Sequence, residues 1–257
     1  MDYIESIILG IVQGLTEFLP ISSSGHLEIF KVVFDSDFST KESLLFTIVL
    51  HFATALSTMV FFRKEISLIF EGLFNSKDKS SKEFSISILI SMIPATLIGF
   101  FFEDTINSFF DGNLIFVGIM LYITAILLYL SDVIISKRNS VNYKNSFIIG
   151  LAQAIAIMPG ISRSGATIAT AVVLGIEREK AARFSFLMVV PLIFGSMLKS
   201  IIDNGGLKFE NFDLITISLG FISAFITGLL ACKWMIALVK KSKLYYFSIY
   251  CLLVGSI

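Results

Sequence analysis

Charge and cysteine are scarce in this sequence, and neither sign of charge is in excess. Charged residues make up 16% of the 257 residues, against about 25% in a typical soluble domain. Lys+Arg and Asp+Glu both number 20, so the basic stripe that nucleic-acid binding requires is missing. Cys232 and Cys251 stand alone in apolar segments, which indicates small buried side chains rather than a disulfide or a zinc site. We therefore expect no nucleic-acid partner and no redox chemistry.

The chain also starts without the basic segment that precedes the apolar core of a signal peptide. Glu5 and Glu17 flank the first apolar run instead, so we expect residues 1–26 to belong to the mature protein. Apolar residues are abundant, at 55% of the chain with 26 phenylalanines, and the mean hydropathy is +0.85. These figures predict a protein whose natural solvent is lipid.

Five nearly uncharged runs have about the 20 residues needed to cross a bilayer. They are residues 44–62, 84–102, 114–131, 184–202 and 214–232. A sixth run, 244–257, has only 14 residues, so it is either a short, tilted span or a span that starts near Lys243. We count it as a span.

Two further apolar segments, 4–30 and 147–174, are interrupted by proline, glycine and serine. In the first, the part compatible with a helix, 7–19, reaches about 20 Å, which is too short for about 30 Å of hydrocarbon. We expect both segments to be re-entrant helix-loop-helix units. Irregular backbone of this kind is tolerated at membrane depth only where protein buries it or where it lines a wet cavity.

The two interrupted segments match each other without a gap at an offset of 140 residues. The identical pairs are Gly10 and Gly150, Gln13 and Gln153, Ile21 and Ile161, Ser22 and Ser162, Ser24 and Ser164, and Gly25 and Gly165. Each half of the chain, about 1–140 and 141–257, then holds one re-entrant unit and three transmembrane helices, and an odd number of spans turns the second half upside down. We predict an all-α polytopic membrane protein, a single integral domain over 1–257 with an inverted-topology repeat.

Lysine and arginine in the loops test this topology, because cytoplasmic loops carry the excess of these residues. With both interrupted segments re-entrant, one face collects 15 of them and the other face 4. If the second segment crossed the membrane, the division would be 10 to 9. The asymmetry favours the re-entrant topology, with the first segment open to the exterior and the second open to the cytoplasm.

Glu17, His26 and Arg163 are the ionisable side chains close to the interruptions of these two segments. An ionisable group within the membrane is costly and is treated as functional by default. The alternatives are a structural ion pair between Glu17 and Arg163 and a histidine with structural hydrogen bonds only. His51 lies inside an unbroken span, where an interhelical hydrogen bond is a better interpretation than catalysis.

Serine-rich loops follow Pro20 and Pro159 and lead into new helices, with serine as the expected N-cap. Helix N-termini at this depth direct free N–H groups and positive dipole ends at an anion such as phosphate. Ordinary turn chemistry explains serines in loops, but their duplication beside Glu17, His26 and Arg163 favours an anion site. A carboxylate and an imidazole there permit proton transfer, nucleophilic attack or metal coordination.

Two stretches of the chain carry a family resemblance. Residues 13–26 read Gln-Gly-Leu-Thr-Glu-Phe-Leu-Pro-Ile-Ser-Ser-Ser-Gly-His, and residues 159–167 read Pro-Gly-Ile-Ser-Arg-Ser-Gly-Ala-Thr. They closely resemble the two signature regions of the bacterial undecaprenyl-pyrophosphate phosphatase family of the bacitracin-resistance type, and the likeness extends over the whole chain in length and span order. The resemblance implies release of the terminal phosphate of undecaprenyl pyrophosphate, which regenerates the lipid carrier of peptidoglycan synthesis, in the bacterial cytoplasmic (inner) membrane.

Carried over by residue, the resemblance implies catalytic roles for Glu17, Ser23, His26 and Arg163, with Arg163 on the phosphate. Gln13 falls where many members have a second carboxylate, so Glu17 is the only acid of its motif and the expected metal ligand. A divalent cation, Mg²⁺ or Ca²⁺, is implied by the resemblance, with substrate phosphates and water completing its shell. The expected substrate contacts are Gln13, Ser22, Ser24, Gly25, Ser162, Ser164, Gly165 and Thr167.

Several roles stay open at this point. Glu17 either binds the metal or acts as a base, His26 is either the nucleophile or an acid/base, and Ser23 either positions the phosphate or attacks it. The expected partners are a polyprenyl pyrophosphate substrate and membrane lipids, with room for a homodimer. The alternative function is a polyprenyl-phosphate or anion transporter or flippase on the same inverted repeat, which predicts transport without bond cleavage.

Overall fold

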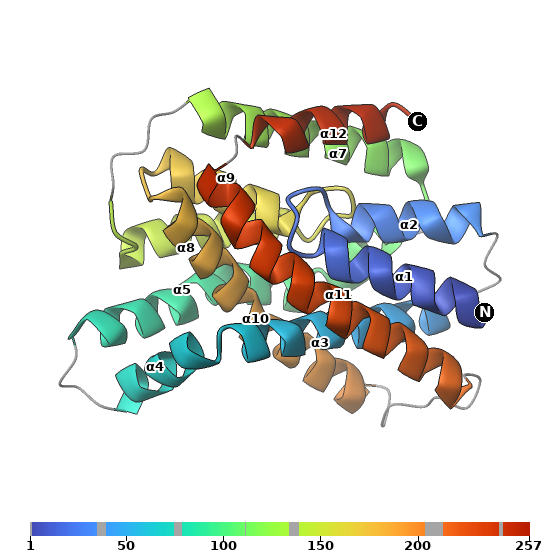
Figure 1. Ribbon diagram of the computed structural model, residues 1–257, viewed down its shortest axis with the longest axis horizontal. Coiled ribbons are helices and arrows are strands. Elements are labelled where there is room, and N and C mark those ends of the chain that lie inside the picture. Colours follow the sequence, from blue (N-terminus) through green and yellow to red (C-terminus); the bar gives the residue numbers. More distant parts are fainter. Residues whose placement is uncertain are drawn as a thin grey trace.

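Helices make up nearly all of the described structure. The computed structural model describes residues 2–34, 40–74, 79–110, 112–133, 139–203, 213–241 and 244–257, and the β structure within them is one isolated bridge, Asn139 with Ile176. The helices are α1 (Tyr3–Thr16), α2 (Ser23–Val33), α3 (Thr40–Phe61), α4 (Arg63–Phe74), α5 (Lys79–Phe101), α6 (Glu103–Asn107), the short 3₁₀ helix η1 (Ser108–Phe110), α7 (Leu114–Val133), α8 (Tyr143–Ile155), α9 (Arg163–Val173), α10 (Arg178–Asp203), α11 (Leu214–Lys241) and α12 (Tyr245–Gly255) (Figure 1). Lys77, Lys137, Arg138, Lys208 and Lys243, which entered the charge comparison, lie outside the described residues.

Four helices, α5, α7, α10 and α11, are long and apolar enough to cross a membrane. They match four of the five long runs expected from the sequence, so an all-helical, multi-pass membrane protein is confirmed. The run 44–62 differs from expectation, because α3 ends at Phe61 and the chain turns by 82° into α4, and α3 meets the same criterion only together with α4. The run 244–257 also differs, because α12 is an apolar helix of 11 residues, about 16 Å long, and is too short to qualify as a span.

The helices pair in a regular way. Helix α1 packs along α11 and α8 packs along α5, while α7 and α12 lie side by side at the top of Figure 1. Small residues allow these close approaches, as is common between membrane helices. A Cβ on Gly14 of α1 would come within 2.7 Å of the carbonyl oxygen of Ala224 in α11, and one on Gly150 of α8 would come within 2.4 Å of that of Ser91 in α5.

Both interrupted segments are buried in protein. Phe18 and Ile21, in the turn between α1 and α2, belong to a core cluster with Leu121 of α7, Ile168 of α9 and Phe186 of α10. The rings of Phe18 and Phe186 meet edge to face at a centroid distance of 5.3 Å. This packing meets the condition that irregular backbone at membrane depth be surrounded by protein.

Ion pairs join the ends of several helices. Arg183 of α10 binds Glu65 of α4 at 2.8 Å, and Lys240 of α11 binds Glu179 of α10 at 3.0 Å. Arg178 of α10 pairs with Asp132 at the end of α7. These contacts connect loops that the charge asymmetry places on the same, lysine- and arginine-rich face.

Candidate active site

The first interrupted segment is a helical hairpin with a tight turn. Helix α1 ends at Thr16, Glu17 is its C-cap, and α2 begins at Ser23. The chain leaves the helical conformation before Pro20, since a residue preceding proline disfavours that conformation. Ser22 has φ of +72° and is the N-cap of α2, where its Oγ accepts a hydrogen bond from the Gly25 N–H at 3.2 Å.

The second interrupted segment repeats this local structure. Ser162 is the N-cap of α9, and its Oγ accepts from the Gly165 N–H at 3.0 Å. Gly160 lies at φ of +95°, a backbone conformation that favours glycine. The hydroxyls of Ser162 and Ser164 are 3.3 Å apart, and those of Ser22 and Ser24 are 3.4 Å apart. Both N-caps predicted from the sequence are confirmed.

The two turns touch each other. A Cβ on Gly25 would lie 3.1 Å from the Cα of Gly160, and the Ser164 hydroxyl donates to the Leu19 carbonyl at 3.2 Å. Thr124 of α7 fixes the second turn, because its Oγ1 accepts from the Ser162 N–H at 2.9 Å and donates to the Gly160 carbonyl at 3.1 Å. The free N–H groups in the first turns of α2 and α9 are thereby brought close together.

Glu17 is the centre of the polar cluster at this junction, and its side chain is buried. Its Oε1 accepts from the Arg163 Nη2. Its Oε2 accepts from Gln13 Nε2 and from the Ser23 hydroxyl, each at 2.9 Å. The expected meeting of Glu17 with Arg163 is therefore confirmed, and Ser23 and Gln13 join the same group.

Arg163 spans the junction from the second hairpin. One Nη reaches Glu17, and the other donates to the carbonyl oxygen of Ser185 in α10 at 3.2 Å. Thr167, one turn along α9, contacts the Ser185 hydroxyl at 2.6 Å. The Thr167 side chain therefore bonds to α10 and helps to hold the helix that carries Arg163, and its expected contact with the substrate stays a prediction.

His51 of α3 lies in the same polar cluster as Glu17. This position was not predicted from the sequence. Its Nε2 is 3.6 Å from Glu17 Oε2, and its Nδ1 binds the Thr47 carbonyl of its own helix at 2.8 Å. The signal was present in the sequence, as an ionisable residue inside an apolar span. It did not show which face of α3 His51 occupies, so the interpretation as an interhelical hydrogen bond missed its place beside the carboxylate.

His26 is oriented by a different set of partners. Its Nδ1 is 2.8 Å from the Ser22 carbonyl, and its Nε2 is 2.8 Å from the hydroxyl of Tyr250 in α12. A carbonyl oxygen only accepts, so Nδ1 carries a proton, and in the neutral ring Nε2 then accepts from Tyr250. The two rings also stack at a centroid distance of 5.6 Å. No signal in the short apolar helix pointed to Tyr250.

The cluster offers part of a shell for a divalent cation. Among the described residues, no group of three or more His, Cys, Asp or Glu side chains is placed to hold a metal ion. Gln13 Oε1, however, is buried without a hydrogen-bond partner, and it lies on the amide whose Nε2 binds Glu17. A carboxylate, a neutral amide oxygen and a hydroxyl are hard oxygen ligands suited to Mg²⁺ or Ca²⁺, so these residues fit a cation that phosphates and water also coordinate.

Fold and site together define a class: a multi-pass helical membrane protein with a protein-enclosed acid and arginine at the junction of two capped helix N-termini. The family model described as bacitracin resistance protein BacA matches residues 6–257, and the chain belongs to this family. Among curated relatives, the undecaprenyl-diphosphatase of Christiangramia forsetii is 56% identical over 99% of this chain and 96% of that protein. The undecaprenyl-diphosphatase of Bacteroides fragilis is 49% identical over 99% of this chain and 96% of that protein. The undecaprenyl-diphosphatase of Methanococcus vannielii is 42% identical over 97% of this chain and 96% of that protein.

Proposed function

We propose that this chain hydrolyses undecaprenyl pyrophosphate to undecaprenyl phosphate and inorganic phosphate in the bacterial cytoplasmic membrane. The observation that carries the proposal is the cluster in which Glu17 of the first turn accepts from Arg163 of the second and from Ser23 at the start of α2. The relatives' printed names support the same activity. The transporter alternative finds no support among the relatives.

Arg163 and the helix N-termini serve to bind the pyrophosphate. The guanidinium now held by Glu17 matches phosphate oxygens in a bidentate manner, so it exchanges the carboxylate for the phosphate when substrate enters. The N–H groups of the first turns of α2 and α9 add donors where negative charge develops in the transition state. The hydroxyls of Ser22, Ser24, Ser162 and Ser164 lie in the same two turns.

Ser23 is the group that Glu17 activates. The hydrogen bond from its hydroxyl to Glu17 Oε2, at 2.9 Å, is the geometry of a nucleophile with its base. Glu17 takes the hydroxyl proton as Ser23 Oγ bonds to the terminal phosphorus, and undecaprenyl phosphate leaves with the bridging oxygen. Water then attacks the phosphoserine, which releases inorganic phosphate and restores the hydroxyl. We place His26 as the acid/base of this second step, with Tyr250 orienting its ring.

A divalent cation at Glu17, Ser23 and the free Gln13 Oε1 would supply charge neutralisation for the phosphate oxygens. The neutral amide of Gln13 contributes one fewer negative charge than a carboxylate would. We therefore expect this chain to hold the cation weakly before substrate arrives, and the phosphates to provide much of the binding.

We also propose that the single domain is an inverted-topology repeat. The contacts of the turns support it, because Gly25 approaches Gly160 while Gly165 approaches Pro20, and each of these contacts maps onto the other at the 140-residue offset. The pairings of α1 with α11 and of α8 with α5 are reciprocal in the same way. In this arrangement the two turns meet near the middle of the membrane, where the substrate headgroup would enter from one side.

The test is phosphate release from undecaprenyl pyrophosphate by the purified chain in detergent with Mg²⁺. We expect Glu17→Gln, Ser23→Ala and Arg163→Gln each to lower the rate of phosphate release by about 100-fold or more. The first variant lacks the base, the second lacks the nucleophile, and the third lacks the cation that binds the phosphate. Terminally labelled phosphate should remain on Ser23 of the wild type after acid quenching and be missing in Ser23→Ala.

Gln153 provides a matched control for the cluster. It is the counterpart of Gln13 at the 140-residue offset, is buried, and has neither amide atom hydrogen-bonded within the described residues. Gln13→Met should reduce release and Gln153→Met should leave it unchanged. Phosphate release that persists in all three cluster variants would refute the site, and a wild type that moves lipid across vesicles without releasing phosphate would refute the phosphatase.

A further inference from the structure

A cavity lies away from the Glu17 cluster, in the corner where α3 turns by 82° into α4. It has a volume of about 430 Å³, within the range of about 300–1,000 Å³ usual for ligand sites. Residues of α3, α4, α10 and α11 and the corner residue Phe62 line it: Val60, Phe61, Phe62, Arg63, Lys64, Glu65, Arg183, Leu229 and Ile236. Neither Glu17, Ser23, His26 nor Arg163 is among them, so this cavity is separate from the proposed active site.

Basic side chains form part of the cavity lining. Arg63, Lys64 and Arg183 contribute three positive charges against the single carboxylate of Glu65. Arg183 is already shared between Glu65 at 2.8 Å and Glu179 at 3.0 Å. Arg63 and Lys64 form no ion pair or side-chain hydrogen bond with any of the described residues. Two uncompensated positive charges therefore face this cavity.

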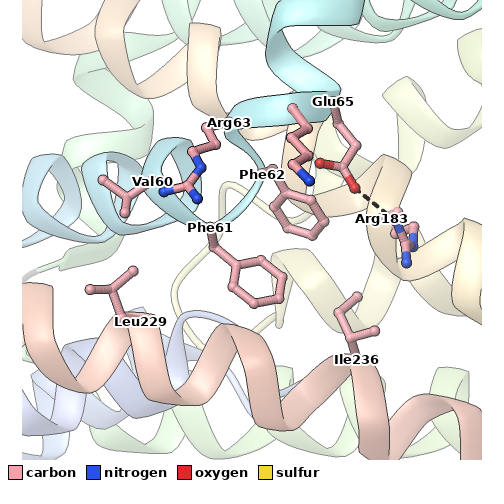
Figure 2. Close-up of a pocket in the computed structure, with 9 residues that line it drawn as sticks. Val60, Phe61, Phe62, Arg63, Glu65, Arg183, Leu229 and Ile236 are labelled. Carbon is pink, nitrogen blue, oxygen red and sulfur yellow. Dashed lines mark hydrogen bonds and ion pairs between the residues drawn. The ribbon is translucent and has the colours of Figure 1, made fainter.

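The rest of the lining is apolar. Figure 2 shows Phe61 reaching across toward Leu229 and Ile236 of α11, with Arg63 and Arg183 on opposite sides of its ring. Val60 and Phe61 are exposed, at 47% and 37% of their surface. A hydrocarbon chain along this wall would cover apolar surface that has no protein partner in the described residues.

The cavity also lies at the level of lipid headgroups. Helix α4 is turned by 82° from α3, so if α3 crosses the bilayer, α4 lies near the plane of the membrane. Leu68 and Phe70 of α4 are more than half exposed, as in helices that rest in the interface. The charge asymmetry assigns Arg63 and Lys64 to the cytoplasmic face, where anionic lipids attract basic residues.

From this geometry we propose that the corner cavity binds one anionic glycerophospholipid of the cytoplasmic leaflet. Its phosphodiester would lie between Arg63 and Lys64, and one acyl chain would follow Val60 and Leu229 toward the membrane interior. The combination of cationic rim, apolar wall and interfacial depth fits a phospholipid better than a water-soluble anion, which has no use for the apolar wall. Occupation would brace α4 against α10 and α11. The proposal does not depend on the phosphatase activity.

Native mass spectrometry tests it directly. The full chain is released from phosphatidylcholine nanodiscs that contain a minor fraction of phosphatidylglycerol, and the anionic lipid retained per chain is counted. The wild type should retain one phosphatidylglycerol, and Arg63→Gln/Lys64→Gln should bind it about tenfold or more weakly, since each basic residue near a membrane surface contributes about 1 kcal/mol. The matched control is Lys79→Gln/Lys82→Gln, which removes two exposed charges from the start of α5, and it should retain the lipid as the wild type does.

Three outcomes would overturn the proposal. The first is equal retention in the wild type and in Arg63→Gln/Lys64→Gln. The second is displacement of the lipid by millimolar inorganic phosphate, which would make this a free-anion site. The third is a raised KM for undecaprenyl pyrophosphate in Arg63→Gln/Lys64→Gln assayed in phosphatidylcholine alone, which would make the corner a substrate subsite. Equal melting temperatures of the two double variants in detergent would show that both are folded.

Discussion

Glu17 is a buried carboxylate whose two oxygens accept hydrogen bonds from Arg163, Gln13 and Ser23. A buried ion pair gains little net stability, because desolvation offsets the attraction, yet removal of one partner leaves a costly unpaired charge. Glu17→Ala would remove the counter-charge, both acceptors and the side-chain volume beside Arg163, whereas Glu17→Gln removes the charge but keeps the volume and one carbonyl acceptor. This is why the neutral isostere is the informative substitution at this position.

The hydroxyl of Tyr250 is a second residue-scale test. Tyr250→Phe removes the donor to His26 Nε2 and leaves the stacked ring in place. We expect kcat to fall by up to about tenfold while KM changes little, because the lost hydrogen bond that orients the His26 ring contributes about 1 kcal/mol. Steady-state phosphate release measures both constants.

Tyr246 supplies the control for this substitution. It lies one turn earlier on α12, is 65% exposed, and no hydrogen bond of its hydroxyl is found within the described chain. Tyr246→Phe should leave both constants unchanged. A wild-type kcat in Tyr250→Phe would show that the hydrogen bond from Tyr250 is not required to orient His26.

At the residue scale, the sequence predicted the features that depend on neighbouring residues in the chain. Ser22 and Ser162 each lie two residues after a turn residue, Pro20 and Gly160, so their capping roles could be predicted from neighbours in the chain. The expectation that the two interrupted segments form one anion site brought Glu17 and Arg163 together, and a direct ion pair between them was one of the alternatives. Tyr250 is 224 residues from His26, and His51 could have faced any side of α3, so neither contact had a local signature.

Among the elements, the pair α7 and α12 depends on two facing glycines. A Cβ on Gly118 would lie 2.8 Å from the Gly255 carbonyl oxygen, and one on Gly255 would lie 2.9 Å from that of Gly118. Gly118→Ala should therefore push α12 outward, lower the free energy of unfolding by about 1–3 kcal/mol and reduce phosphate release, since α12 carries Tyr250. Thermal melting and the release assay check both effects.

Gly99 in α5 is the matched control for this prediction, because a Cβ there would meet nothing within 4 Å. Gly99→Ala should be neutral or stabilising by up to about 1 kcal/mol, the usual helix-propensity difference. If Gly118→Ala melts no earlier than Gly99→Ala, the close approach of the two helices is not required.

The bend between α3 and α4, after Phe61, was not predicted from the sequence. Residues 60–64 contain no proline or glycine, the usual causes of a sharp kink. The charged stretch that begins at Arg63 is visible in the sequence. The packing of Phe62 against Phe186 of α10 and the ion pair of Glu65 with Arg183 depend on the tertiary structure. The four long spans, by contrast, were predictable because hydropathy over about 20 residues is a strong signal.

For the whole molecule, the testable feature is which loops share a side of the membrane. Single cysteines at Lys82 and Lys180 should react with an impermeant maleimide only from the cytoplasm, and cysteines at Thr105 and Asp213 only from the exterior. All four positions are exposed, whereas the native Cys232 and Cys251 are buried, so background labelling should be low. Labelling of Lys82 and Lys180 from opposite sides would refute the re-entrant second segment.

The distance along the chain between the partners of the cluster has a consequence for biosynthesis. Arg163 follows Glu17 by 146 residues, and Tyr250 belongs to the last helix. A nascent chain therefore carries Glu17 and Ser23 well before Arg163 is made, and His26 meets Tyr250 only after α12 has followed α11. We expect the assembled site to form only after both halves of the chain have entered the membrane.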